Sequence, residues 1–449
     1  MYKQWLVLAY LEIPAEFPMA STCLQLSVTN HATAHTRNVV GNFMNPRNRM
    51  EIIQNQYHTK ETLYFAITRM LERASYYGFR TLVVLYMVGE TLKMERSEAI
   101  SIYGWLTASL VFSQILGAVL GDLVIGNRKI VILGAILQAI GTFCLCIPST
   151  TGLYLGLFLI VLGSGFFTPN LISNYGKLYI NKSKLLDSGF TIFHLATNLG
   201  SFFGVLLIAQ LSDKYGFNIG FILAGLLMLI SLIPILLSKE KHFEKTENKK
   251  GGLNKRILII VMIFILVGLF WGFNDLSYPR ISDLQLQFKE LSSSVFPEYF
   301  WQVSNTIFFL PISIIAIILW NKFYSNQFFK IMLGFIFGAV AMGILLLIPV
   351  VPSEQNLIVF IISLLFFAIA EVHISPVLYS ILTKYSNPKY LTILISFTFL
   401  PTALISFAFG MFNDKIYDNP ILGLKIGIIG MAIIGIGLSG FIWWNKKLQ

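Results

Sequence analysis

A succession of long apolar stretches, separated by short polar connections, constrains the fold of this chain more than any other feature. A helix needs about 20 mostly apolar residues to cross the hydrocarbon core of a bilayer. The chain is 55% hydrophobic and only 12% charged, whereas soluble proteins carry about 25% charged residues. These values exclude an ordinary soluble enzyme and a disordered scaffold. We therefore expect an all-α polytopic membrane protein with twelve transmembrane helices. The expected spans are 62–88, 99–121, 129–148, 153–175, 188–210, 217–237, 256–276, 300–320, 329–350, 357–382, 390–411 and 421–444.

The most polar segment after residue 60 lies midway along the chain and divides the expected spans into two sets of six. Residues 238–256 read SKEKHFEKTENKKGGLNKR, which is typical of a solvated linker. Two six-helix bundles joined by a charged linker are the layout of major facilitator transporters. The sequence therefore predicts a first bundle over 61–237 and a second over 257–445.

The first 60 residues differ from the rest, because they are polar and show no period. We expect them to lie outside the fold, as a disordered extension or as the result of a misassigned start, with Met50 the alternative first residue.

The excess of positive charge has two possible interpretations. A net charge of +11 would suggest nucleic acid in a soluble protein, but cytoplasmic loops of membrane proteins also collect Lys and Arg. The even-numbered connections and the C-terminal tail hold 18 basic residues, against 7 in the odd-numbered connections. The distribution predicts an integral protein of the plasma (inner) membrane with both termini in the cytoplasm. Its partners would then be lipid and not nucleic acid.

No constellation for catalysis, metal or cofactor binding occurs in a supporting context. The three cysteines form neither a disulfide framework nor a metal site. Glycines such as Gly163, Gly200 and Gly204 are expected to allow close helix packing. We therefore expect a protein that is not an enzyme and needs no cofactor.

The first span carries ionisable groups, which are costly in a membrane and indicate function. At about 100° per residue, Arg69, Glu72, Arg73, Tyr76 and Arg80 fall on one narrow stripe. Such a stripe must face water or opposite charge. The alternative is a structural seam of ion pairs between helices.

Two acids in the second half, Asp275 and Glu371, balance the charge of the stripe. We hypothesise that these groups pair across the two halves and that substrate or proton binding breaks the pairs. His194 in the fifth span is a candidate proton carrier, although a histidine satisfied by helix packing is the commoner case.

The loop after the second span reads GAVLGDLVIGNRK and resembles the loop signature of major facilitator transporters. Gly117, Asp122, Gly126 and Arg128 occupy its motif positions. Glycines allow a tight turn there, and Asp122 is suited to cap a helix end or to pair with a base across the two halves.

Further motifs resemble the proton-dependent oligopeptide transporter family. LERASYYGFR (71–80) is similar to its ExxERFxYYG signature. SGFFTPN (164–170), DSGFTIFHLATNLGSFFG (187–204), FWGFND (270–275), WQVSN (301–305) and EVHISPVLYSILTK (371–384) resemble its segments in spans 4, 5, 7, 8 and 10. The resemblance covers the chain from 62 to 384.

The resemblance implies alternating access and proton-coupled uptake of di- and tripeptides by a monomer. It also implies roles for individual residues. Glu371 would bind the peptide amino terminus, Asn198 and Asn305 the peptide backbone, and Arg73 the carboxylate end. Tyr76 and Tyr77 would line the site, Glu72 would serve proton coupling, and Arg80 would pair with Asp275.

Several positions depart from the family pattern. The first acid of the signature is Arg69, the span-4 lysine is Thr168, and a span-5 aromatic is His194. We hypothesise that Arg69 replaces the lost lysine, as partner of Glu371 or of a substrate carboxylate. Two alternatives therefore stay open: a transporter of another carboxylate-bearing solute with altered or lost proton coupling, and a non-transporting membrane scaffold.

Overall fold

The computed structural model describes residues 57–239, 252–291, 308–323, 325–410, 416 and 419–447. Across these residues the regular structure is helical. Ten of the described helical segments are long and apolar enough to cross a membrane, which agrees with an integral membrane protein. The expectations for residues 1–56, and for most of the linker, lie outside the described residues.

The helices of the first half pack against one another. They are α4 (Lys60–Val88), α5 (Arg96–Leu120), η1 (Gly121–Ile125), α6 (Asn127–Cys144), α7 (Thr150–Lys177), η2 (Ser183–Leu185), α8 (Leu186–Tyr215), α9 (Phe217–Ile230) and α10 (Leu232–Leu237).

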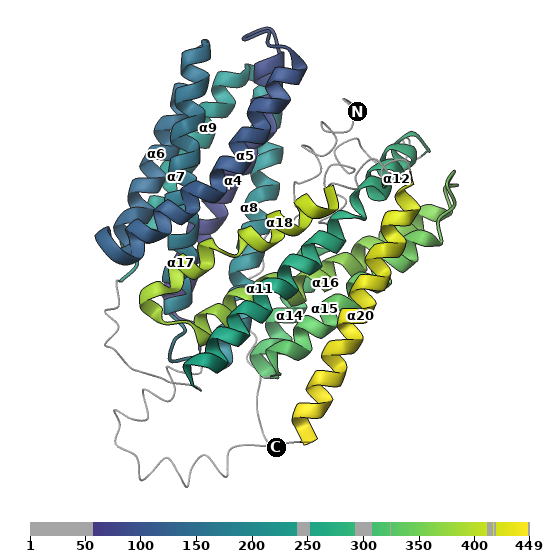
Figure 1. Cartoon of the computed structure of the whole chain (residues 1–449). Coiled ribbons are helices and arrows are strands. Elements are labelled where there is room, and N and C mark those ends of the chain that lie inside the picture. The colour runs from purple at the N-terminus through teal and green to yellow at the C-terminus, as the bar shows by residue number, and fades with distance from the viewer. Residues whose placement is uncertain are drawn as a thin grey trace, which may run out of the picture.

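The described helices of the second half form another group. They are α11 (Leu253–Asp275), α12 (Tyr278–Leu291), α14 (Phe309–Lys322), α15 (Gln327–Leu346), α16 (Asn356–Tyr385), η4 (Pro388–Tyr390), α17 (Leu391–Ser396), α18 (Phe399–Gly410) and α20 (Pro420–Lys447). Figure 1 shows the two groups side by side, the purple-to-teal helices of the first half at upper left and the green-to-yellow helices at lower right.

Two expected spans are each divided into two helices by a proline. The stretch 217–237 breaks at Ser231 and contains Pro234, and the stretch 390–411 breaks at Phe397 and contains Pro401. Proline lacks the backbone N–H that continues a helix, but it is tolerated in the first turn of a new one.

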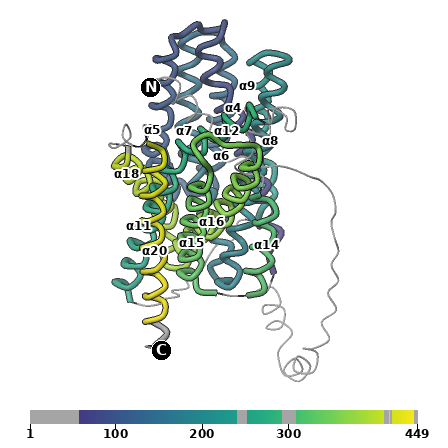
Figure 2. The backbone as a smooth tube through the Cα atoms, turned by 90° about the vertical axis from the view of Figure 1, so that its right-hand side faces the viewer, coloured from purple at the N-terminus to yellow at the C-terminus, as the bar shows by residue number. Residues whose placement is uncertain are grey.

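The contacts between the halves run along α8 and around α17. Helix α8 packs against α14 and α16, while α17 packs against α5 and α7. Figure 2, turned by 90° from Figure 1, again places α8 beside helices of the second half. Side chains on α8 are therefore placed to connect the halves.

Glycines set the distance between α4 and α8. A Cβ on Gly204 would lie 2.1 Å from the carbonyl oxygen of Ala74, and one on Gly200 would lie 2.0 Å from that of Met70. These contacts confirm the packing role expected of both residues and hold the polar stripe of α4 against α8.

We expect Gly204→Ala to destabilise the protein by about 1–3 kcal/mol, because the added methyl group meets backbone atoms of α4 that cannot rotate away. Gly104→Ala on α5 is the matched control, since nothing lies within 4 Å of its Cβ position. Thermal unfolding in detergent measures both. Equal melting temperatures for the two variants would contradict this account of the α4–α8 contact.

Candidate functional site

The centre of the polar stripe is a cluster of three charged side chains on α4. Arg69 Nη1 donates to Glu72 Oε2 at 3.1 Å, and Arg73 Nε donates to the same oxygen at 2.7 Å. Arg73 also bonds the other carboxylate oxygen. Glu72 is fully buried, and the side chains of Arg69 and Arg73 are only 8% and 10% exposed. One carboxylate therefore serves two buried guanidinium groups.

Neighbouring helices complete the surroundings of the two arginines. Arg69 Nε donates to Thr197 Oγ1 on α8 at 3.1 Å, and its guanidinium lies 5.5 Å from the ring of Phe193. Arg73 donates to Thr168 on α7 at 3.3 Å, so this threonine accepts a hydrogen bond where the family pattern has a lysine.

The two tyrosines of the stripe lie beside Arg73. Its guanidinium carbon lies 4.7 Å from the ring centroid of Tyr76 and 5.5 Å from that of Tyr77. Aromatic faces attract cations at such distances. The tyrosines therefore help to hold the guanidinium in place.

The cluster has an excess of one positive charge and spare donors. Within the described part of the chain, Arg69 Nη2 and Arg73 Nη1 make no hydrogen bond. Guanidinium groups bind carboxylates with pairs of parallel N–H donors. The cluster is therefore suited to receive an additional anionic group.

These contacts correct two hypotheses from the sequence. Glu72 pairs with two arginines of its own helix rather than across the halves: Arg69, which is three residues before it and lies on the same face, and the adjacent Arg73, whose guanidinium reaches back to it. Arg69 takes Glu72 as its carboxylate partner and not Glu371, whose described partner is His194.

A second group of polar residues lies where α8 meets α16. His194 Nε2 is 3.5 Å from Glu371 Oε1, and it is 3.2 Å from Asn198 Nδ2 on its own helix. Asn198 is 1% exposed. This contact joins the two halves, although the family pattern has an aromatic residue at position 194.

The remaining predicted residues have their own partners. Arg80 donates to Tyr103 and lies 5.3 Å from its ring, and Asp275 accepts from Ser406 on α18. The Arg80–Asp275 pair stays a prediction. Asn305 lies outside the described residues.

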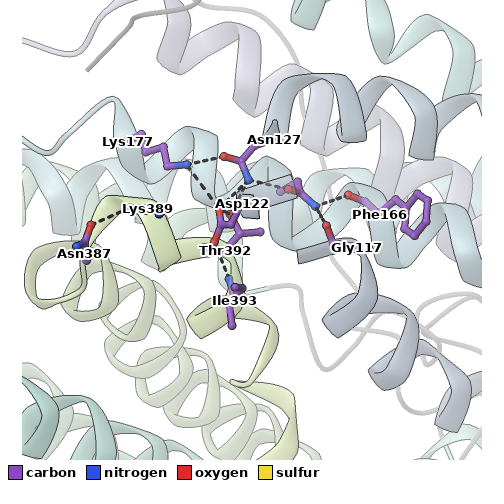
Figure 3. Close-up of polar contacts among 10 residues, drawn as sticks. Gly117, Asp122, Asn127, Phe166, Lys177, Asn387, Lys389, Thr392 and Ile393 are labelled. Atoms are coloured by element: carbon purple, nitrogen blue, oxygen red, sulfur yellow. Dashed lines mark hydrogen bonds and ion pairs between the residues drawn. The ribbon is translucent and has the colours of Figure 1, made fainter. Parts of the chain in front are cut away.

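The loop motif after α5 meets a helix end in the other half (Figure 3). Asp122 Oδ2 accepts from the backbone N–H groups of Thr392 and Ile393 at 2.9 and 3.1 Å, within the first turn of α17. Asn127 Nδ2 bonds Asp122 and Thr392, and Lys177 lies 3.9 Å from Asp122. A carboxylate at a helix N-terminus satisfies free donors and opposes the helix dipole, as the sequence suggested for Asp122.

The other motif residues shape this loop. Gly126 adopts φ +95°, which favours glycine. A Cβ on Gly117 would lie 2.5 Å from the carbonyl oxygen of Gly165 on α7. Arg128 donates to the carbonyls of Ile235 and Leu236 at the end of α10.

A buried ion pair between the halves was missed by the sequence reasoning. Lys330 Nζ on α15 lies 2.5 Å from Asp187 Oδ2 on α8, and the two side chains are 2% and 4% exposed. Gln327 and Ser380 also donate to Asp187, and the Lys330 ammonium lies 4.4 Å from the Trp320 ring. Lys330 is the fourth residue of α15. Its position one turn inside an apolar helix was the available signal.

A histidine just before α4 ties this segment to α8. His58 Nδ1 lies 2.9 Å from the Tyr179 hydroxyl, and its Nε2 lies 3.3 Å from Ser188 Oγ. Burial and the nearby Lys182 lower the pKa of His58 from its ordinary value. The folded state therefore favours the neutral ring.

Comparison with known proteins finds similarity to transporters. The model of the POT family matches residues 128–296. An uncharacterised transporter, YclF of Bacillus subtilis, is 32% identical over 236 residues, which cover 50% of this chain and 47% of YclF. A di-/tripeptide transporter of Lactococcus lactis subsp. cremoris is 30% identical over 217 residues, 46% of this chain and 44% of the relative. The chain thus matches about half the length of these curated relatives.

Solved structures match over a longer region. A peptide transporter POT in complex with sulfate has a TM-score of 0.59 at 20% identity, covering 86% of this chain and 95% of that structure. A POT family transporter in complex with 5-aminolevulinic acid also has a TM-score of 0.59, at 21% identity, covering 85% and 97%.

The fold is similar to that of these solved transporter structures. The chain is thus similar to members of the POT family, the family whose motifs its sequence resembles. Members of this family are transporters and not enzymes.

We expect Asp187→Ala to destabilise the protein by about 3–5 kcal/mol, because it leaves the Lys330 ammonium buried without its carboxylate. The double variant Asp187→Ala/Lys330→Met is expected to recover most of the loss. Thermal unfolding in detergent measures both. Glu90→Ala, which removes the exposed Glu90–Lys93 pair, is the control and is expected to change nothing measurable. A double variant no more stable than Asp187→Ala would contradict the pairing.

We expect acidification from about pH 7 to about pH 5 to lower the melting temperature less in His58→Gln than in the unaltered protein. A histidine whose pKa is lower in the folded state adds stability above its unfolded pKa, and this stability is lost as pH falls through the folded pKa. Thermal unfolding at the two pH values measures the difference. Equal losses would exclude a contribution of His58.

Proposed function

We propose that this protein is a secondary active transporter that takes up di- and tripeptides together with protons by alternating access. The Lactococcus lactis relative is a di-/tripeptide transporter, and proton coupling is the property that the POT family implies. The proposed architecture has twelve spans, the ten apolar segments together with α4 and α14. The first carries the polar stripe, and the second is a shorter apolar helix. The proposed unit is a monomer in contact with lipid.

The observation that carries this proposal is the separation of charge between the halves. On the first half, Arg69 and Arg73 offer spare N–H donors beside one shared carboxylate. On the second half, Glu371 supplies a carboxyl group. Its described partner is His194 of the first half, which is uncharged when its ring is unprotonated. A peptide with a carboxylate at one end and an ammonium group at the other complements this arrangement.

We assign the proposed roles by matching these residues to the positions of the family motifs. Glu371 binds the peptide ammonium, and Asn198 and Asn305 contact the peptide backbone. Arg73 binds the carboxylate, with Arg69 supplying the second cation in place of the lysine absent at Thr168. Tyr76 and Tyr77 flank the peptide, Glu72 and His194 serve proton coupling, and Arg80 pairs with Asp275.

The end of the molecule that contains the Asp122 and Asp187 contacts is proposed to face the cytoplasm of the plasma membrane, with both termini on that side. The basic residues Arg128, Lys177 and Lys389 lie at this end, which agrees with the positive-inside rule. Since the halves are joined here, transport requires these contacts to break when the site opens to the cytoplasm.

A second candidate function has support from one observation. The Arg69–Glu72–Arg73 cluster carries two positive charges and one negative charge in a buried setting. A solute that brings one carboxylate and no ammonium group would neutralise this excess of one positive charge without needing a carboxylate on the second half.

We expect the protein in proteoliposomes to accumulate a dipeptide when an inward proton gradient is imposed. Glu371→Gln is expected to reduce accumulation about tenfold or more, because it removes the charged partner of the ammonium group. Glu354→Gln is the control, since Glu354 lies exposed in the connection before α16. Radiolabelled uptake measures each variant.

The other outcomes separate the alternatives. Exchange of peptide without accumulation would mean that proton coupling is lost. Movement of a carboxylate-bearing solute that lacks an ammonium group, but not of peptides, would favour the second candidate. No movement of any solute would overturn the proposed transport and leave the scaffold alternative.

A further inference from the structure

The contact between His194 and Glu371 is a direct polar link between the two halves, about two turns inside α8 and near the middle of α16. The two side chains are 13% and 20% exposed, and Nε2 lies 3.5 Å from Oε1. The ring of His194 also lies against Phe309 of α14, with centroids 6.0 Å apart. Both groups are therefore mostly removed from water.

The hydrogen-bond pattern favours a proton in this contact. Asn198 Nδ2 lies 3.2 Å from His194 Nε2, and with the amide in this orientation its N–H donates to the ring nitrogen. Nε2 then has a lone pair and no hydrogen, and a carboxylate oxygen beside it would also offer only lone pairs. A proton on Glu371 Oε1 turns this repulsion into an O–H···N hydrogen bond.

The charged groups around the contact also favour a protonated carboxyl group. On α4, Arg69 faces His194 but is bonded to Glu72 and Thr197. On α16, Tyr379 lies near Arg69, and His373 faces Trp320 and Phe337 instead. On α14 the neighbour is the uncharged Phe309. Among the described residues, no arginine or lysine forms an ion pair with Glu371, and an uncompensated carboxylate is costly at this depth.

We infer that His194 and Glu371 share one proton that bridges the two halves while the substrate site is empty, and that a substrate ammonium group displaces it. The second part rests on the proposed function, in which Glu371 receives the ammonium group. The described contacts identify His194 as a positioning residue for Glu371, where the family pattern has an aromatic side chain.

The displacement step balances in protons and charge. The ammonium group of the substrate approaches Glu371, and the proton on Oε1 passes to Nε2 of His194. The products are a carboxylate paired with ammonium, and an imidazolium. The neutral O–H···N hydrogen bond between the halves is replaced by a charged imidazolium–carboxylate contact that the ammonium group shares, so substrate binding and loss of the neutral bridge are one event.

Infrared difference spectroscopy of the reconstituted protein tests the bridge without any peptide. A protonated Glu371 gives a carboxyl C=O band that is lost in Glu371→Gln. We expect His194→Phe to shift this band to higher wavenumber, because the carboxyl group loses its hydrogen-bond acceptor. His194→Gln retains an acceptor and is expected to keep the band near its original position.

The matched control is His373→Phe, two residues from Glu371 on the same helix. The His373 ring packs between Trp320 and Phe337, with Nδ1 bonded to the Ile369 carbonyl oxygen. Its replacement is expected to leave the band unchanged. A spectrum without a band specific to Glu371 would overturn the shared proton, and a band insensitive to His194→Phe would overturn the role of His194.

Adding dipeptide then tests displacement. Loss of the Glu371 carboxyl band on peptide binding is the expected result, and a band that persists with bound peptide would overturn the displacement step. Absence of peptide binding, with the empty-state band and its His194 dependence intact, would contradict the proposed function while leaving the proton bridge supported.

Discussion

The structure depends on the high cost of an uncompensated charge inside a membrane. Hydrocarbon offers neither hydrogen bonds nor counter-ions, so ionisable side chains must face protein groups or water. Helix α4 meets this requirement with Glu72 between Arg69 and Arg73. The glycines of α8 then bring its backbone close enough for Thr197 to accept from Arg69. The polar stripe and the close packing of α4 and α8 are thus parts of one arrangement.

Polar contacts connect the halves at three described places. Asp122 caps α17, Asp187 pairs with Lys330, and His194 contacts Glu371. The Asp122 and Asp187 contacts lie at helix ends on one side of the molecule, whereas the third lies nearer the middle. Because the Asp187–Lys330 pair is buried, separation of the halves there must either hydrate both groups or provide new partners. Breaking this buried pair therefore costs free energy, so the pair stabilises the end at which the halves are joined.

The side chains that depart from the family motifs have polar partners in the folded protein. Where the pattern has an acid, Arg69 shares the carboxylate of Glu72, and where it has a lysine, Thr168 accepts from Arg73. Where it has an aromatic residue, His194 reaches the acid of the other half. Each of the three substituted side chains therefore has a polar partner in the central region.

The sequence by itself determined where most of the helices lie and the polar face of α4, but not the division of two spans or the helix α12. The span expected at 62–88 corresponds to α4 at Lys60–Val88, because apolar length and helical period are local properties. The stripe of α4 and the cap at Asp122 followed from residue spacing and a motif. Which side chains meet across the halves was decided only by the tertiary structure. Asp187 and Lys330 are far apart in the chain, and periodicity identifies the face of a helix but not the helix that packs against it.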